Sequence, residues 1–250
     1  MLTAERHRII LELLAKKEVV KLQELVEATS SSESTIRRDL SQLEKEKKLK
    51  RVHGGAALLQ QKREELSVFE KSTKNIKEKQ IIAKYAASLV RDGDCIYLDA
   101  GTTTLQMIPF LEAKDIVVVT NGVMHLEALM EKEIPTYLLG GMVKQKTKAL
   151  IGRGAIRALE SYSFDKCFIG ANGVHIDYGY TTPDPEEALV KSMAMKLSRQ
   201  AYVLADHSKI NESTFAKIAN LDEATLITDA LDEELLAQYE AKTAIEVVTK

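Results

Sequence analysis

A regular alternation of helical stretches with short β-rich runs, which begins at Ile76, constrains the fold of this chain more than any other feature. Strands that are separated by helices are typical of parallel pairing, because each helix carries the chain back along the sheet to the start of the next strand. The sequence therefore predicts an α/β domain with a mainly parallel sheet. Its expected strands are residues 95–99, 116–120, 136–139, 166–170, 201–205, 225–228 and 245–248.

The first 57 residues follow a different pattern, that of three short helices and a hairpin. Apolar residues recur at helical spacing around Ile10, Leu25 and Leu40, and a polar turn at residues 29–31 precedes the third helix. Short strands on either side of Gly54-Gly55 predict a β-hairpin. Three helices with a tight turn before the third, followed by a hairpin, predict a winged helix-turn-helix.

The third predicted helix carries side chains that suit DNA. Ser32 can cap its N-terminus, and its hydroxyl and guanidinium groups lie off the apolar face, where they can reach phosphate oxygens and base edges. Asp39 would be repelled by phosphate, so we expect it to orient an arginine or to face the body of the domain. The alternative for these residues is a solvated basic surface. The predicted DNA-contacting residues are Ser34, Thr35, Arg37 and Arg38 in the helix and Lys50, Arg51 and His53 in the hairpin.

Charge and composition limit the possible partners. The 250 residues are enough for two domains, and the formal net charge is −2. Residues 1–57 hold 12 Lys and Arg against 9 Asp and Glu, whereas the remainder is acidic, which suits contact with nucleic acid at one end only. No stretch approaches the roughly 20 apolar residues of a membrane span. We expect a cytoplasmic protein without a signal peptide, a metal site or a disulfide, with Cys95 and Cys167 both buried.

Polar residues gather where the predicted strands end, which is where parallel sheets bind ligands. The run from Asp99 to Thr104 places a glycine and three threonines at the start of a helix, whose free N–H groups and hydroxyls can hold an anion. The alternative is an ordinary threonine-rich cap. Lys209, just beyond another strand, can neutralise a phosphate.

Further strand ends bring amide and charged side chains to the same edge. Asn-Gly pairs are also ordinary turns, and Glu187 with Lys191 could be an exposed ion pair. Gly152-Arg153-Gly154 is only part of a dinucleotide fingerprint, so no cofactor is predicted. The predicted ligand-binding residues are Asp99, Gly101, Thr102, Thr103, Thr104, Asn121, Gly122, Gly141, Lys144, Asn172, Gly173, Glu187, Lys191 and Lys209.

Both halves of the chain resemble the DeoR family of bacterial transcription regulators. The N-terminal half carries that family's signature in Arg6, Ile10, Leu14, the run from Ser32 to Leu40 and the hairpin from Arg51 to Ala56. The second half is similar to the family's sensor domain in residues 99–103, 120–122, 140–141, 172–173, 187–191 and 205–209. The resemblance implies a winged helix-turn-helix over 1–57 and a Rossmann-like α/β sensor over 77–250 that is similar to the ribose-5-phosphate isomerase fold. Residues 58–76 form a charged stretch with few apolar residues, which predicts a linker that can be partly helical.

The same resemblance implies operator DNA and a phosphorylated sugar as partners. Residues 94–105, 117–125, 172–175 and 181–189 resemble family members that control fructose operons in Gram-positive bacteria, which implies a repressor with fructose 1-phosphate as its inducer. An activator, or a sensor of another sugar phosphate, has the same architecture. A sugar-phosphate isomerase with a DNA-binding head is a further alternative. Asn172 stands where similar isomerases carry an acidic residue, although Asp99 and Glu187 remain as possible bases, so we expect no enzyme.

We expect several copies of this chain to assemble, because the protein must recognise an operator. Specific operators usually engage two or more winged helices, because one such module buries a modest area. We therefore expect a homo-oligomer, either a dimer or a tetramer.

Overall fold

The computed structural model describes residues 1–17, 19–46, 48–52, 54–58 and 65–248, and within it the chain divides into two compact units, residues 1–61 and 62–250. Each unit has its own hydrophobic core.

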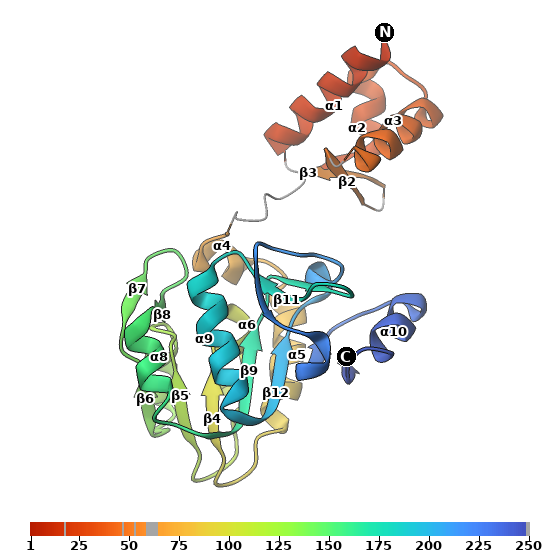
Figure 1. Ribbon diagram of the computed structural model, residues 1–250. Helices are drawn as coiled ribbons and strands as arrows, with labels where there is room; N and C mark the ends of the chain where they lie inside the picture. The colour runs from red at the N-terminus through yellow and green to blue at the C-terminus, as the bar shows by residue number, and fades with distance from the viewer. Residues whose placement is uncertain (18, 47, 53, 59–64, 249–250) are drawn as a thin grey trace. The chain divides into compact units, whose positions relative to one another are not determined.

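The first unit is a winged helix-turn-helix, as the sequence predicts (Figure 1). Its core is formed where the apolar faces of the helices meet, and Ile10, Leu25 and Ile36 are fully buried there. Its elements are α1 (Thr3–Lys17), β1 (Val19–Lys21), α2 (Leu22–Thr29), α3 (Glu33–Lys45), β2 (Leu49–Val52) and β3 (Gly55–Leu58).

Strand β1 was not predicted from the sequence. It pairs antiparallel with β3, which gives the described part of the wing the strand order β1-β3-β2. The strands approach closely at Gly55, where an added Cβ would lie 2.2 Å from the carbonyl oxygen of Val20, so glycine is required at this position. Strand β1 is only three residues long and pairs with residues some 36 positions away, so the residues around it carry little pattern from which a strand could be predicted.

A parallel sheet forms the centre of the second unit, in which the described strands have the order β15-β14-β12-β9-β4-β5-β6. The predicted α/β class is therefore confirmed. Each strand that the sequence predicts is present with ends shifted by a few residues at most. The strands are β4 (Cys95–Leu98), β5 (Val117–Thr120), β6 (Thr136–Leu138), β9 (Phe164–Gly170), β12 (Ser198–Leu204), β14 (Thr225–Thr228) and β15 (Ile245–Val247).

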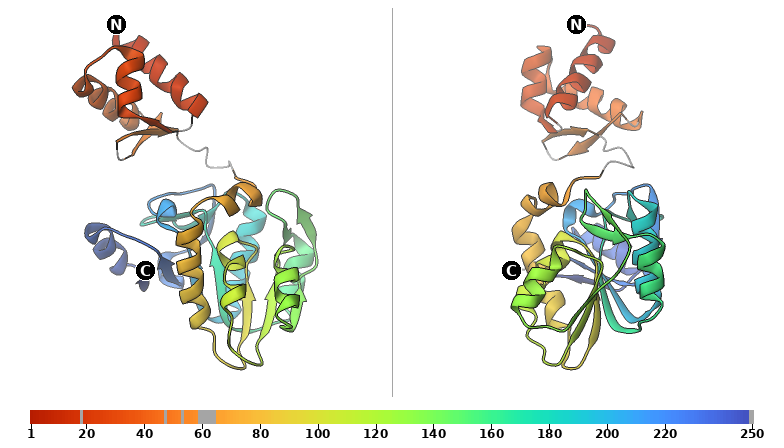
Figure 2. Two further views of the ribbon diagram at one scale, coloured as in Figure 1. Left: turned by 180° about the vertical axis from the view of Figure 1, so that it is seen from behind. Right: turned by 90° about the vertical axis from the view of Figure 1, so that its left-hand side faces the viewer.

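Helices cover both faces of this sheet, as the front and back views show (Figures 1 and 2). Strand β4 illustrates why both faces are apolar: Tyr97 packs in one hydrophobic cluster, whereas Ile96 and Leu98 pack in the other. Helices α5 (Ile76–Ser88) and α7 (His125–Glu131) contribute to the second cluster, and α8 (Arg153–Leu159) and α9 (Pro185–Lys196) to the first. The remaining helical elements are α6 (Thr102–Leu105), α10 (Glu233–Glu240), η1 (Ile108–Phe110), η2 (His207–Lys209) and η3 (Leu221–Glu223).

Several elements of the second unit were not predicted. A hairpin of β7 (Met142–Lys144) and β8 (Ala149–Ile151) follows β6, and a small sheet pairs β10 (Gly173–His175), β11 (Gly179–Thr182) and β13 (Ala216–Ala219). Helix α4 (Val68–Thr73) lies within residues 58–76, which the sequence analysis assigns to a linker. From Glu65 onward this segment belongs to the second unit and packs against it.

One prediction about the cysteines is wrong. Cys167 is buried, but Cys95 is exposed, because it is the first residue of β4 and lies where that strand enters the sheet. Neither cysteine takes part in a disulfide. Among the described residues, no helix is long and apolar enough to cross a membrane, and no group of three or more potential ligands could hold a metal ion.

Candidate functional site

Helix α3 begins at a capped turn with charged and hydroxylated side chains on its outer face. The hydroxyl of Ser32 accepts a hydrogen bond of 3.3 Å from the backbone N–H of Thr35, which caps the helix. Ser34 and Arg38 are exposed, and Arg38 has no hydrogen bond or ion pair with any residue that the structure describes. Arg37 is also exposed, and its Nη2 lies 2.6 Å from Oε1 of Glu33 one turn earlier. This face of α3 presents two guanidinium groups to the exterior.

The hairpin is joined to α3 through Arg51. Its Nη1 donates to the hydroxyl of Ser41 at 2.8 Å, and its backbone N–H donates to Oε1 of Glu44 at 2.8 Å. Lys50, on the same strand, is half-buried. His53 lies outside the described residues. The structure thus places the other six predicted DNA-contacting residues on α3 and on the strand that is hydrogen-bonded to it.

Asp39 faces the interior of the first unit, as expected, but it does not pair with the neighbouring arginines. Its partner is Arg6 of α1, whose Nε lies 2.7 Å from Oδ2. Burial raises the pKa of the Asp39 carboxyl, but the hydrogen bond from Arg6 and the charges of Arg6 and His7 outweigh it, so the net pKa is lowered. Asp39 is therefore held ionised and away from the exposed face of α3.

In the second unit, the chain reverses its direction across the sheet between β4 and β9. Strands β5 and β6 follow on one side of this pair, and β12, β14 and β15 follow on the other. The crevice beyond the carboxyl ends of two such strands is where open parallel sheets bind ligands. Asp99, which follows β4, is 1% exposed here; its Oδ2 accepts a hydrogen bond of 3.1 Å from the N–H of Gly170 and contacts the ammonium group of Lys191.

Residues 100–104, which follow Asp99, are called the threonine loop. The hydroxyl groups of its three threonines, Thr102, Thr103 and Thr104, have different surroundings. Thr104 is fully buried, and its hydroxyl donates to the carbonyl oxygen of Asp99 at 2.5 Å and accepts from the N–H of Gly101 at 3.0 Å. This hydroxyl holds the turn together. The side chains of Thr102 and Thr103 have no hydrogen bond with a described residue, and Thr103 is buried.

His125 is a buried residue at this loop that the sequence analysis missed. Its Nε2 lies 3.2 Å from the Thr104 hydroxyl, whereas its Nδ1 is buried without a hydrogen-bond partner among the described residues. Burial lowers the pKa of His125 to about 4, so the ring is neutral at physiological pH. Gly122 lies against this ring, because an added Cβ would be 2.3 Å from Nδ1. A histidine at the start of a helix gives no signal of this role in the sequence.

The two predicted asparagines also connect loops. Asn121 accepts from the N–H of Ala100 at 2.8 Å through Oδ1 and donates to the carbonyl oxygen of Leu150 at 3.2 Å. Asn172 is half-buried, and its Oδ1 accepts from the hydroxyl of Thr182 at 3.1 Å. The first is committed to bracing the threonine loop, whereas the amide nitrogen of Asn172 has no hydrogen-bond partner among the described residues.

Two of the predicted glycines are required by packing. An added Cβ at Gly141 would lie 2.5 Å from the carbonyl oxygen of Ile151, and one at Gly173 would lie 2.5 Å from that of Glu212. Both glycines therefore allow a close approach of two backbone segments beside the crevice.

A cluster of charged residues extends from β7 to the start of α9. The Nζ atom of Lys144 lies 2.7 Å from Oδ2 of Asp184 and 3.1 Å from Oε1 of Glu187, and it also contacts Glu65. Burial lowers the pKa of Lys144, but these carboxylates raise it by more. Glu187 accepts a further hydrogen bond of 2.6 Å from Thr147. Glu65 and Thr147 were not predicted, because one lies in a charged stretch and the other in a lysine-rich loop.

Lys209 lies in η2, where the chain leaves β12, and it is half-buried. Burial raises the pKa of the neighbouring Asp206, but the charge of Lys209 and hydrogen bonds from Ser208 and Asn75 lower it by more. The Asn75 Nδ2 atom lies 2.8 Å from Oδ1 of Asp206. The start of α5 is therefore joined to the same edge of the sheet.

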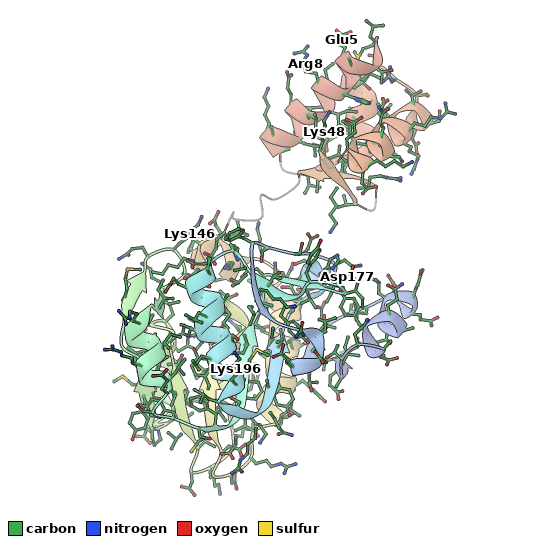
Figure 3. All side chains as sticks on the ribbon, viewed as in Figure 1. Glu5, Arg8, Lys48, Lys146, Asp177 and Lys196 are labelled. Carbon is green, nitrogen blue, oxygen red and sulfur yellow. The ribbon has the colours of Figure 1, made fainter. Side chains whose placement is uncertain are left out.

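Little free space lies beside Gly101 and His125 in this structure. A cavity of about 10 Å³ lies beside the threonine loop, which is room for about one water molecule. Val68 of α4 lines it together with Gly101, His125 and Thr147. Figure 3 labels Lys146, at the edge of this unit where α4 and the start of α9 lie, and Lys196, which is the last residue of α9.

Comparison with known families covers both units. Residues 6–62 match the DeoR-like helix-turn-helix domain, and residues 74–230 match the DeoR C-terminal sensor domain.

Comparison with individual proteins gives full-length matches. The chain is 56% identical over 249 residues to the HTH-type transcriptional regulator FruR of Bacillus subtilis, which covers 99% of each chain. It is 36% identical over 251 residues to the lactose phosphotransferase system repressor of Staphylococcus aureus, which covers 98% of each chain. Among solved structures, ribose-5-phosphate isomerase A of Methanocaldococcus jannaschii aligns with a TM-score of 0.42 and 22% identity, over 55% of each chain.

Proposed function

The chain belongs to the DeoR family of transcription regulators, and from this premise we propose that it represses a sugar-utilisation operon and leaves its operator when it binds a sugar phosphate, specifically fructose 1-phosphate. It is a regulator and not an enzyme, since the relatives that it matches over their full length are named as transcriptional regulators. Such a regulator acts in the cytoplasm, where the operator DNA is.

The DNA-binding part of the proposal rests on the outer face of α3. Arg37 and Arg38 are directed to the exterior, and an arginine that reaches the major groove can donate two hydrogen bonds to guanine. Ser34 and Thr35 at the first turn, with Lys50 and Arg51 on the hairpin, are proposed to contact phosphates. Each operator half-site would take one winged helix, so we propose that the chain acts as a homo-oligomer, a dimer or a tetramer.

The sensing part rests on one observation: charged side chains converge at the carboxyl ends of β4 and β9, where Asp99 and Lys191 form a buried ion pair. Ionisable side chains that are buried together in a crevice of this kind are characteristic of a ligand-binding site. Thr102, Thr103 and Lys209 are proposed to hold the phosphate, since a dianion needs hydrogen-bond donors and a cation. Asp99, Asn172 and Glu187 are proposed to bind sugar hydroxyls, with Lys191 orienting Asp99.

Seven predicted residues have other roles in this proposal. The hydroxyl of Thr104 and the amide of Asn121 are engaged in hydrogen bonds that hold the loops, so they position the site instead of contacting the sugar. Gly101, Gly122, Gly141 and Gly173 permit the close packing around it. The ammonium group of Lys144 contacts three carboxylates in this structure, so it is not assigned to the sugar here.

The sign of regulation and the choice of sugar have different support. One relative is named a lactose phosphotransferase system repressor, which supports repression of a sugar-utilisation system. The choice of fructose rests on the resemblance of residues 94–105, 117–125, 172–175 and 181–189 to family members that control fructose operons. An activator would have the same DNA-binding and effector-binding sites. Measuring the transcript of the operon in a deletion strain distinguishes a repressor from an activator, because loss of a repressor raises transcription in the absence of the sugar.

The proposal is tested by titrating the full-length protein onto a DNA fragment from upstream of its own operon, with and without a panel of sugar phosphates. Fructose 1-phosphate should weaken binding by about 5–150-fold, the range of ordinary allosteric coupling, whereas fructose and inorganic phosphate should have smaller effects. If the affinity for this fragment stays the same with every sugar phosphate in the panel, the sensing function is wrong.

A further inference from the structure

Glu65 is a buried carboxylate that is held between two lysines. It is 6% exposed, and its two oxygens have different partners: Oε1 lies 3.1 Å from Nζ of Lys71, and Oε2 contacts Nζ of Lys144. Two ammonium groups that converge on one anion form the kind of site that also suits a phosphate, whose oxygens accept charge-assisted hydrogen bonds.

The charges around this position make Glu65 and a bound phosphate mutually exclusive. Lys144 already contacts Asp184 and Glu187, and the negative charge of Glu187 also acts on Lys71. A phosphate dianion that was added while Glu65 was in place would lie among several carboxylates and be repelled. A phosphate that replaced Glu65 would instead gain the ammonium group of Lys71, which loses its carboxylate partner when Glu65 leaves, and that of Lys144, which Asp184 and Glu187 still contact.

Helix α4, which follows Glu65, lies over the threonine loop. It contacts α6, and the N–H of Val68 donates to the carbonyl oxygen of Lys146 at 2.9 Å. Val68 also lines the cavity of about 10 Å³ beside Gly101. A sugar phosphate needs far more room than one water molecule, so a ligand that extends into this cavity must displace Val68 and with it α4. This observation is independent of the charges and points to the same segment.

We propose that Lys71 and Lys144 form an anion subsite and that Glu65 occupies it when no effector is bound. The phosphate group of the effector, which Thr102, Thr103 and Lys209 are proposed above to hold, takes this subsite as well by displacing Glu65 together with α4. The two sets of residues lie near each other, because α4 contacts α6 and the charges of Lys71 and Lys209 both act on Lys79. The identity of the ligand rests on the function proposed above. The subsite itself adds Glu65 and Lys71 to the residues of the sensor. Because residues 65–73 come soon after the first unit in the chain, their displacement changes the segment through which the sensor is joined to the DNA-binding residues.

The test compares Glu65→Gln with the matched variant Glu112→Gln, both in the full-length protein. Glu112 is exposed and has no hydrogen bond or ion pair with a described residue, so its substitution makes the same chemical change away from the subsite. The probe in calorimetry is inorganic phosphate. Removing the competing charge should tighten phosphate binding by about tenfold in Glu65→Gln, as expected for the loss of one charged hydrogen-bond partner, and Glu112→Gln should bind like wild type.

A second readout follows the position of α4. Hydrogen exchange of the amides of residues 68–73 should be faster in Glu65→Gln than in wild type, and phosphate should accelerate it in wild type. The amides of β4 and β9 should be unchanged, which distinguishes local release from unfolding. Lys71→Gln, at a side chain that is partly exposed, should weaken phosphate binding and provides a test if Glu65→Gln does not fold.

Equal phosphate affinity in wild type and Glu65→Gln, or unchanged exchange of residues 68–73, would overturn the subsite. If wild type still leaves its operator with a sugar phosphate, the proposed function stands and only the subsite fails. If phosphate competes with Glu65 as expected while no sugar phosphate alters operator binding, the subsite stands and the sensing function fails.

Discussion

The carboxylate of Asp39 in α3 accepts hydrogen bonds from the guanidinium group of Arg6 in α1, whose Nε and Nη2 lie 2.7 and 3.1 Å from Oδ2 and Oδ1. His7 Nε2 lies 3.2 Å from the same Oδ1. Such a two-pronged pair is more directional than a single ion pair, and it joins the first helix to the third. It also leaves the exposed face of α3 to Arg37 and Arg38.

Replacing Asp39 by Asn should therefore destabilise the first unit by about 1–3 kcal/mol, because Arg6 loses a charged partner in a partly buried place. Chemical denaturation followed by helicity measures this change. The control is Glu33→Gln, which breaks only the exposed pair with Arg37 and should cost less than about 1 kcal/mol. Equal effects of the two variants would contradict a structural role for Asp39.

The same pair predicts a dependence on pH. The native pKa of Asp39 is lowered, whereas the unfolded carboxyl has a pKa of about 3.9. The contribution of the pair to stability is then complete above the unfolded value and is lost as the pH falls through the lowered native value. Acid titration of wild type should show this loss, and Asp39→Asn should show less of it.

Substitution of the two exposed arginines tests α3 as the DNA-binding element. If Arg37 or Arg38 reads a base, its replacement by Ala should cost about 1–3 kcal/mol on the operator and relax specificity at one position. An arginine that contacts phosphate should instead weaken binding to all sequences and reduce the salt slope by about one. A folded double variant that binds the operator like wild type would exclude this helix from the interface.

Lys209→Ala tests the proposed phosphate contact at the end of β12. A dianion in a partly dehydrated crevice needs a compensating cation, so this variant should lose the response to the effector and keep its affinity for the operator. Operator binding with and without fructose 1-phosphate measures both properties. Lys196→Ala, at the far end of α9, is the matched control (Figure 3). A response of Lys209→Ala equal to that of wild type would remove Lys209 from the phosphate site.

Coupling between the two units must be reciprocal. An effector lowers DNA affinity only if it binds the DNA-free arrangement better, and by linkage the operator then weakens effector binding by the same factor. Calorimetry of fructose 1-phosphate with and without saturating operator measures that factor. Equal affinities in both titrations would exclude this sugar phosphate as an inducer that acts on DNA affinity, although the DNA-binding assignment would survive.

Local sequence patterns determined most of the architecture. The strands of the parallel sheet and the N-cap at Ser32 were predicted, because each depends on residues within a few positions of one another. The family resemblance was likewise carried by short runs, and the matches to residues 6–62 and 74–230 confirm it. The candidate site at the strand ends followed from the rule that parallel sheets bind ligands at that edge.

Only the tertiary structure decided which polar groups meet one another. Glu65 and Lys144 are 79 positions apart, and Arg6 and Asp39 are 33 apart, so no local pattern could pair them. The contact of His125 with the Thr104 hydroxyl and the pairing of β1 with β3 also depend on segments that are distant in the chain. Local spacing specifies helices, strands and caps, whereas the environment of a charge is set by whatever the folded chain brings against it.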